Sequence, residues 1–202
     1  MKMPKVLLIL SILYSGSAWT QEYIHVTKEP FHKPVFQNDS LTVIELKMQP
    51  GDTSLFHLHS EPILYLTLKG ANMWLHSDDG NARVVELPDG WIGSDNYGVH
   101  NPFAHQIAVA DSGPLHLIAI LQFKASSGRT PVEDDDVIYR GDGFAVQLDS
   151  STQALRLTEK INIVYKGSAF KGNERMVPGD FFFSGQELSE PSENFKYYRV
   201  FF

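Results

Sequence analysis

The sequence predicts an all-β protein that folds as a sandwich or barrel. From Leu41 onward, short apolar or alternating runs are broken by Gly, Pro, Asn and Asp, which is typical of many short strands. No segment has the period of an amphipathic helix. Residues 76–81 contain Asp-Gly and Gly-Asn, which supply the positive φ that tight hairpin turns need. The chain therefore consists of strands joined by hairpins.

The strands follow one another along the first two thirds of the chain. We expect them at residues 41–48, 54–59, 63–68, 72–76, 83–87, 106–110 and 115–123. Residues 124–136 lose the apolar periodicity and indicate an exposed linker, so a boundary is expected there. Residues 195–202 predict a terminal strand docked in a sheet, because their apolar side chains would otherwise promote aggregation.

Two histidines in the second expected strand are the main candidate metal ligands. His57 and His59 are two residues apart, and alternate residues of a strand point to one face, so both imidazoles converge on one spot. Imidazole is a common ligand for Zn, Cu, Fe and Ni. The alternative is a pair of partly exposed strand histidines without a metal.

The residues around this pair resemble the first motif of the cupin family. That motif consists of Gly, five residues, His-x-His, three or four residues, Glu, six residues and Gly. Gly51, His57, His59 and Gly70 match it in register. Ile63 stands where the motif has Glu.

A later segment, residues 101–109, resembles the second cupin motif, and His105 is the matching histidine. The Gly that normally lies between Pro102 and this histidine is missing, and Val109 replaces an Asn of the motif. The resemblance is strong for residues 35–125 and weak beyond. It implies a double-stranded β-helix, or jelly-roll, barrel over residues 21–125, with a metal held by His57, His59 and His105.

Within the family, this ligand pattern is similar to the three-His dioxygenases that act on cysteine, diketones and aromatic acids. The resemblance implies a divalent transition metal, with Fe(II) favoured and Zn, Ni, Mn or Cu as alternatives. It also implies a dioxygenase-like enzyme, or a lyase or isomerase, for a small acidic or aromatic molecule. The alternative is a non-catalytic binding module for a small ligand or sugar, with a structural or vestigial His site. A homodimer is compatible with either function.

Two further residues are candidate catalytic groups. Glu61 lies two residues before the expected Glu position and could act as an acid or base at the pocket mouth, or lie in a surface turn before Pro62. His100 could bind substrate or be an exposed loop histidine. Five aromatic side chains could line an apolar cavity or simply fill the core, namely Tyr65, Trp74, Trp91, Tyr97 and Phe103.

The last part of the chain, residues 137–202, contains a faint repeat of the first. Residues 42–46 align with 144–148, 68–70 with 165–167, and 87–91 with 177–181. No histidine follows His116, so this part has no His site. We expect a degenerate cupin-like second half that completes or flanks the barrel; the alternative is three chance matches in a β-rich sequence.

The first 20 residues have the layout of a secretory signal peptide, with Lys2 and Lys5, an apolar stretch at 6–13 and small residues at 15–18. The apolar stretch is shorter than the about 20 residues that span a bilayer, so we expect cleavage and a periplasmic or secreted protein. The chain has no cysteine, which excludes disulfides and thiolate ligands. The formal net charge of −7 argues against nucleic acid and anionic membrane surfaces as partners.

Overall fold

The computed structural model describes residues 23–110, 113–123, 137–150, 161–183, 186 and 188–201. The predicted leader at 1–20 and linker at 124–136 therefore lie outside the described residues. Apart from one 3-10 turn, η1 (Val26–Lys28), every element of this part is a strand, which confirms the all-β class. Within these described residues, no helix has the length and apolarity that a membrane crossing requires.

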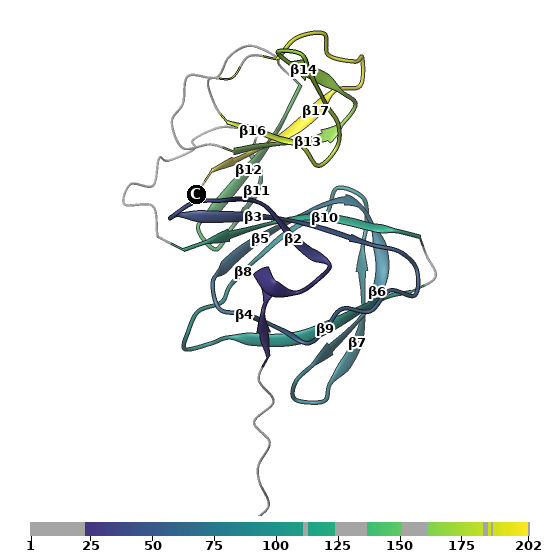
Figure 1. Cartoon of the computed structure of the whole chain (residues 1–202), viewed down its shortest axis with the longest axis vertical. Helices are drawn as coiled ribbons and strands as arrows, with labels where there is room; N and C mark the ends of the chain where they lie inside the picture. Colours follow the sequence, from purple (N-terminus) through teal and green to yellow (C-terminus); the bar gives the residue numbers. More distant parts are fainter. Residues whose placement is uncertain are drawn as a thin grey trace, which may run out of the picture.

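The first half of the chain forms two five-stranded sheets (Figure 1). The first sheet has the order β1 (Ile24–His25), β4 (His57–His59), β9 (Phe103–Val109), β6 (Ala71–Ser77) and β7 (Ala82–Leu87). The middle sheet has the order β2 (His32–Gln37), β3 (Leu41–Met48), β10 (Leu115–Gln122), β5 (Pro62–Lys69) and β8 (Ile92–Asn96). All neighbours are antiparallel except β1 and β4.

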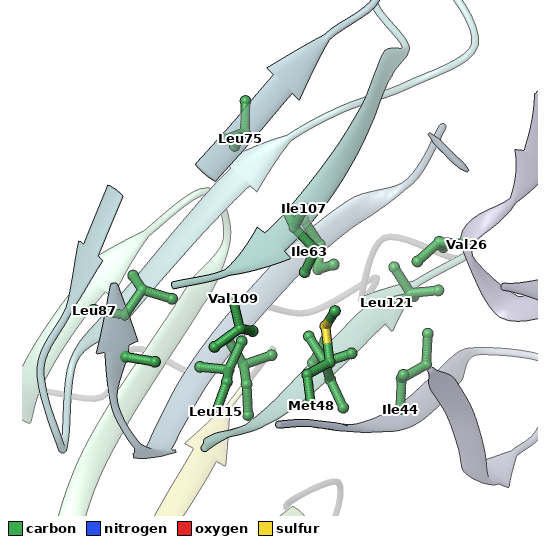
Figure 2. Packing of buried hydrophobic residues seen from close by; sticks show 14 residues of the cluster. Val26, Ile44, Met48, Ile63, Leu75, Leu87, Ile107, Val109, Leu115 and Leu121 are labelled. Carbon is green, nitrogen blue, oxygen red and sulfur yellow. The ribbon is translucent and has the colours of Figure 1, made fainter. Parts of the chain in front are cut away.

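The two sheets face each other across an apolar core. Ile63 and Leu121 from the middle sheet and Ile107 from the first sheet are at most 3% exposed. Figure 2 shows Met48, Leu115 and Val109 close together where the two sheets meet. Side chains that alternate along each strand produce this interdigitated layer, as in other β-sandwiches.

A third sheet covers the opposite face of the middle sheet. Its order is β11 (Val137–Gly141), β12 (Phe144–Asp149), β17 (Lys196–Phe201), β13 (Ile161–Lys166) and β16 (Phe181–Phe183). Ile118 and Ile120 of β10 join one buried cluster with Val146 and Val200 of the third sheet. The middle sheet is therefore buried on both faces, which explains why β10 is almost continuously apolar. The terminal strand, predicted at 195–202, lies in the centre of this third sheet as β17.

The third sheet repeats the strand order of the middle sheet. β11, β12, β17, β13 and β16 occupy the places of β2, β3, β10, β5 and β8. Gly90 N donates to Thr67 O at 2.8 Å, and Gly179 N donates to Val164 O at 2.9 Å, so the turns before β8 and β16 are held alike.

A short hairpin of β14 (Ala169–Lys171) and β15 (Glu174–Met176) follows β13, as β6 and β7 follow β5. All three sequence matches fall on equivalent places, so the second half is a degenerate copy of the first. Among the described residues it has no counterpart of β4 or β9, the strands that carry the candidate ligands.

Candidate metal centre

The structure brings the three predicted histidines together in the first sheet. His57 lies opposite His105 in the register of β4 and β9, and His59 follows on the same face of β4. The ring centroids are 4.5 Å apart for His57 and His105, 4.8 Å for His59 and His105, and 5.1 Å for His57 and His59. One ligand nitrogen from each ring lies within 4.8 Å of the others.

The register that joins these rings is held by the segment before β4. Ser54 N donates to the carbonyl of Ile107 at 2.9 Å, and the Ser54 Oγ accepts from Ile107 N at 3.0 Å. The side-chain amide of Gln106 donates to the Ser54 carbonyl at 2.8 Å. Because the Ile107 N–H donates to the Ser54 side chain and not to a backbone carbonyl, the regular strand pairing is interrupted at Ser54. The strand β4 therefore begins at His57 rather than at residue 54 as predicted.

Burial keeps the three imidazoles neutral. It lowers the pKa of His57 to about 4 and that of His105 to about 2, and it holds the pKa of His59 well below its ordinary value. Repulsion from the protonated form of a neighbouring histidine lowers these pKa values in the same direction. Neutral imidazole is the form that ligates metals, so at neutral pH the three side chains are ready to coordinate an ion.

The unpaired nitrogens of the site fit a metal ion. The Nδ1–H of His57 donates to the Leu55 carbonyl at 2.9 Å, which fixes its tautomer and leaves Nε2 as the donor atom. No described residue hydrogen-bonds to His57 Nε2, to either ring nitrogen of His59, or to His105 Nδ1, although all four atoms are buried. Buried polar atoms without a partner cost free energy, and a shared cation would satisfy them.

Ile63 occupies the place of the missing carboxylate and is fully buried. The cluster that the described residues provide is therefore three imidazoles without an acidic ligand. A neutral nitrogen donor set without thiolate suits Fe(II), Zn, Ni or Cu.

His59 and His105 line a cavity of about 470 Å³ between the first and middle sheets, and His57 lies behind them, outside the lining. Its walls are mainly apolar and include four of the five predicted aromatic residues, Tyr65, Trp91, Tyr97 and Phe103. The fifth, Trp74, points away from the cavity and is 46% exposed. A cavity of this size suits a small molecule.

A buried Glu–His pair beside the site was not predicted. Glu29 is 2% exposed, and its carboxylate accepts from the backbone N–H groups of Phe31, His32 and Leu55. The same carboxylate bonds to His32 Nδ1 at 2.6 Å, and the His32 ring centroid lies 4.4 Å from that of His57. Although burial opposes it, the hydrogen bonds from His32 and the Leu55 N–H lower the pKa of Glu29. A Glu-x-x-His pair in the arm before the barrel was the available signal.

The two predicted catalytic residues lie apart from the cavity lining. Glu61 bonds to His25 Nε2 at 2.9 Å and accepts from Ser60 Oγ at 2.8 Å, just before Pro62 begins β5. His100 is exposed in the turn that Asn101 closes. Neither residue is among those that line the cavity, and a catalytic role for either remains a prediction.

The first two sheets have the jelly-roll strand order. Three histidines at the motif positions converge on one of these sheets. The first two sheets form a cupin fold. The chain thus has the architecture that its motifs implied, together with a degenerate second cupin half.

No family model and no curated protein matches the chain. Among solved structures, a cupin domain from Bordetella pertussis Tohama I is 17% identical, with a TM-score of 0.40 over 46% of this chain and 92% of that chain. An RmlC-like cupin family protein from Methanocaldococcus jannaschii is 13% identical, with a TM-score of 0.37 over 45% and 77%. A DMSP lyase from Ruegeria pomeroyi DSS-3 is 20% identical, with a TM-score of 0.33 over 45% and 42%.

Proposed function

We propose that this protein is a metal-dependent enzyme that converts a small molecule, with His57, His59 and His105 holding a divalent transition metal, Fe(II) favoured. The observation that carries the proposal is the set of buried, neutral and unpaired imidazole nitrogens on three adjacent rings, of which His59 and His105 line a cavity. When bound, the metal would supply positive charge that polarises substrate atoms and, for Fe(II), redox chemistry.

The chain's own residues prepare this site in three ways. The Leu55 carbonyl orients His57 through its Nδ1–H. The apolar walls of the cavity exclude water, which strengthens electrostatic interactions inside. Burial raises the pKa of Tyr65 well above its ordinary value, and the nearby Tyr97 acts in the same direction, so the Tyr65 hydroxyl in the cavity lining keeps its proton and bears no charge.

A non-catalytic binding module is the second candidate, because Ile63 replaces the carboxylate ligand that cupin motifs carry. Replacement of single histidines separates the two functions. An enzyme should lose turnover when His57, His59 or His105 is changed to Ala, whereas a binding module should keep its ligand affinity.

Metal content is the first test. We expect about one metal ion per chain in protein purified without chelator and without a histidine-rich tag, measured by elemental analysis. The His57→Ala/His59→Ala double variant should lose the metal, whereas His76→Ala, which changes a histidine outside the cluster, should retain it. Absence of metal after reconstitution with Fe(II), Zn, Ni, Mn and Cu would contradict the proposal.

We also propose that the mature protein acts outside the cytoplasm after removal of the leader. The support is the charge and apolar pattern of residues 1–20. N-terminal sequencing of the protein recovered from the extracytoplasmic fraction would show a new N-terminus near residue 19 or 21. Recovery of the uncleaved chain in the cytoplasm would contradict this proposal.

A further inference from the structure

Arg83 places a positive charge at the cavity that His59 and His105 line. It lies on β7 opposite Leu75 of β6, which in turn lies opposite Ile107 of β9. Ile107 is two residues from His105 on the same strand, so Arg83 and His105 project from the same face of the first sheet. Arg83, His59 and His105 all line the cavity.

The register also sets how far apart these groups are. Arg83 is two strand spacings from β9, which corresponds to about 10 Å across the sheet. The neighbours on β7 agree with the inward direction of Arg83, because Val85 lines the cavity while Val84 is 55% exposed. One small molecule can therefore lie between the guanidinium at the mouth and the histidines.

The guanidinium forms no ion pair within 4.0 Å in the described part of the chain. Among the described residues that line the cavity, Arg83 is the only lysine or arginine. Asp95 lines the same cavity, but no carboxylate oxygen of a described residue lies within 4.0 Å of the Arg83 nitrogens. Asp95 hydrogen-bonds with the Tyr97 side chain, and the charge of Arg83 acts on Asp95 only from beyond ion-pair distance. An exposed arginine that forms no direct ion pair at an apolar cavity is a site for an anionic ligand group.

We propose that the ligand of this cavity is a small carboxylic acid, whose carboxylate binds Arg83 while its apolar body lies between Arg83 and the three histidines. The planar guanidinium matches a carboxylate in a two-bond geometry. A phosphate group would need further cationic side chains, which the described lining does not offer. Calling the acid a substrate rests on the proposed function, whereas its binding to Arg83 requires no turnover.

Calorimetric titration of the protein as purified tests this inference with three acids and their amides: benzoate, phenylacetate and hexanoate, each paired with the corresponding neutral amide. We expect at least one acid to bind about tenfold or more tightly than its amide. Arg83→Gln should abolish this preference and Arg83→Lys should restore part of it. Lys33→Gln removes the same charge from the exposed strand β2, outside the cavity lining, and should leave the preference unchanged.

Three results would overturn the inference: no acid binds, the preference survives in Arg83→Gln, or Lys33→Gln loses it equally. The His57→Ala/His59→Ala variant separates this inference from the proposed function. If that variant keeps the preference for acids while the wild type contains no metal, Arg83 binds carboxylates and the metalloenzyme proposal alone fails. If the preference depends on the histidines and not on Arg83, the acid binds at the histidines and the inference is wrong.

Discussion

The stability of the metal-free protein should fall steeply between pH 7.5 and pH 5.0. Burial lowers the pKa of His57 from about 6.5 to about 4. Below about pH 6.5 the unfolded chain takes up a proton at this residue, whereas the folded chain does so only near pH 4. The contribution of His57 to the free energy of unfolding is therefore fully present above pH 6.5 and decreases as the pH falls toward 4.

The size of this effect follows from the same pKa values. One pKa unit corresponds to about 1.4 kcal/mol, so at pH 5.0 the contribution of His57 is about 2 kcal/mol smaller than at pH 7.5. His105, with its pKa lowered to about 2, contributes a similar loss of about 2 kcal/mol at pH 5.0. A combined loss of about 4 kcal/mol is a large fraction of the 5–15 kcal/mol that is typical of domains.

Urea denaturation in the presence of chelator, followed by circular dichroism at pH 7.5, 6.0 and 5.0, measures this loss. The His57→Gln variant keeps a polar side chain that does not titrate, so its free energy of unfolding should decrease by about 2 kcal/mol less than that of the wild type over this range. The carboxylates are unchanged in both proteins and cancel in the comparison. Equal losses in the two proteins, or a wild-type stability that is independent of pH, would refute the reasoning.

Three substitutions test other parts of the structure. Glu29→Gln removes the negative charge of the side chain that accepts three backbone N–H groups, including that of Leu55. The free energy of unfolding should decrease by about 2–4 kcal/mol in urea denaturation. An unchanged free energy of unfolding would show that the pair with His32 is not structural. Gly93→Ala would place its Cβ against the Trp91 indole, so the indole must move and the fluorescence emission of the protein should shift; the same substitution in a Trp91→Phe background should produce no such shift. Ile118→Ala opens a cavity between the middle and third sheets and should cost about 2–5 kcal/mol in denaturation while leaving metal content unchanged; loss of metal would contradict the separation of the two layers.

The ligand cluster was predictable because it depends on a local rule. His57 and His59 share a face through strand parity alone, and the motif spacing added His105. The strand at 41–48 was also predicted with its observed bounds, since its apolar residues are bounded by Asn38 and Pro50. In both cases, short stretches of sequence carry the information.

Two edge strands, β2 and β8, were missed because tertiary pairing, and not composition, makes them strands. β8 has the sequence IGSDN, which is poor in strand-forming residues, yet it pairs with β5 from Leu66 to Pro62. β2 contains Pro34, which lies at a register shift against β3 and is tolerated because β2 is an edge strand.

The Glu29–His32 pair was also missed, because its partner Leu55 is 26 residues away from Glu29 along the chain. Nothing in the local sequence of the arm indicates that it folds against the His57 ring. The Glu-x-x-His spacing was a signal for the pair itself, but the place of the pair beside the His57 ring depends on the packed structure.

The middle sheet explains why a copy that lacks histidines is retained. Val43, Leu66 and Ile120 form its outer face, and only the third sheet covers them in the described structure. A chain that ended before Val137 would present this face to water as a broad apolar surface with a strong tendency to self-associate. The second half thus acts as a cover that keeps this apolar face away from water, so we expect truncation to the histidine-bearing half to yield aggregates.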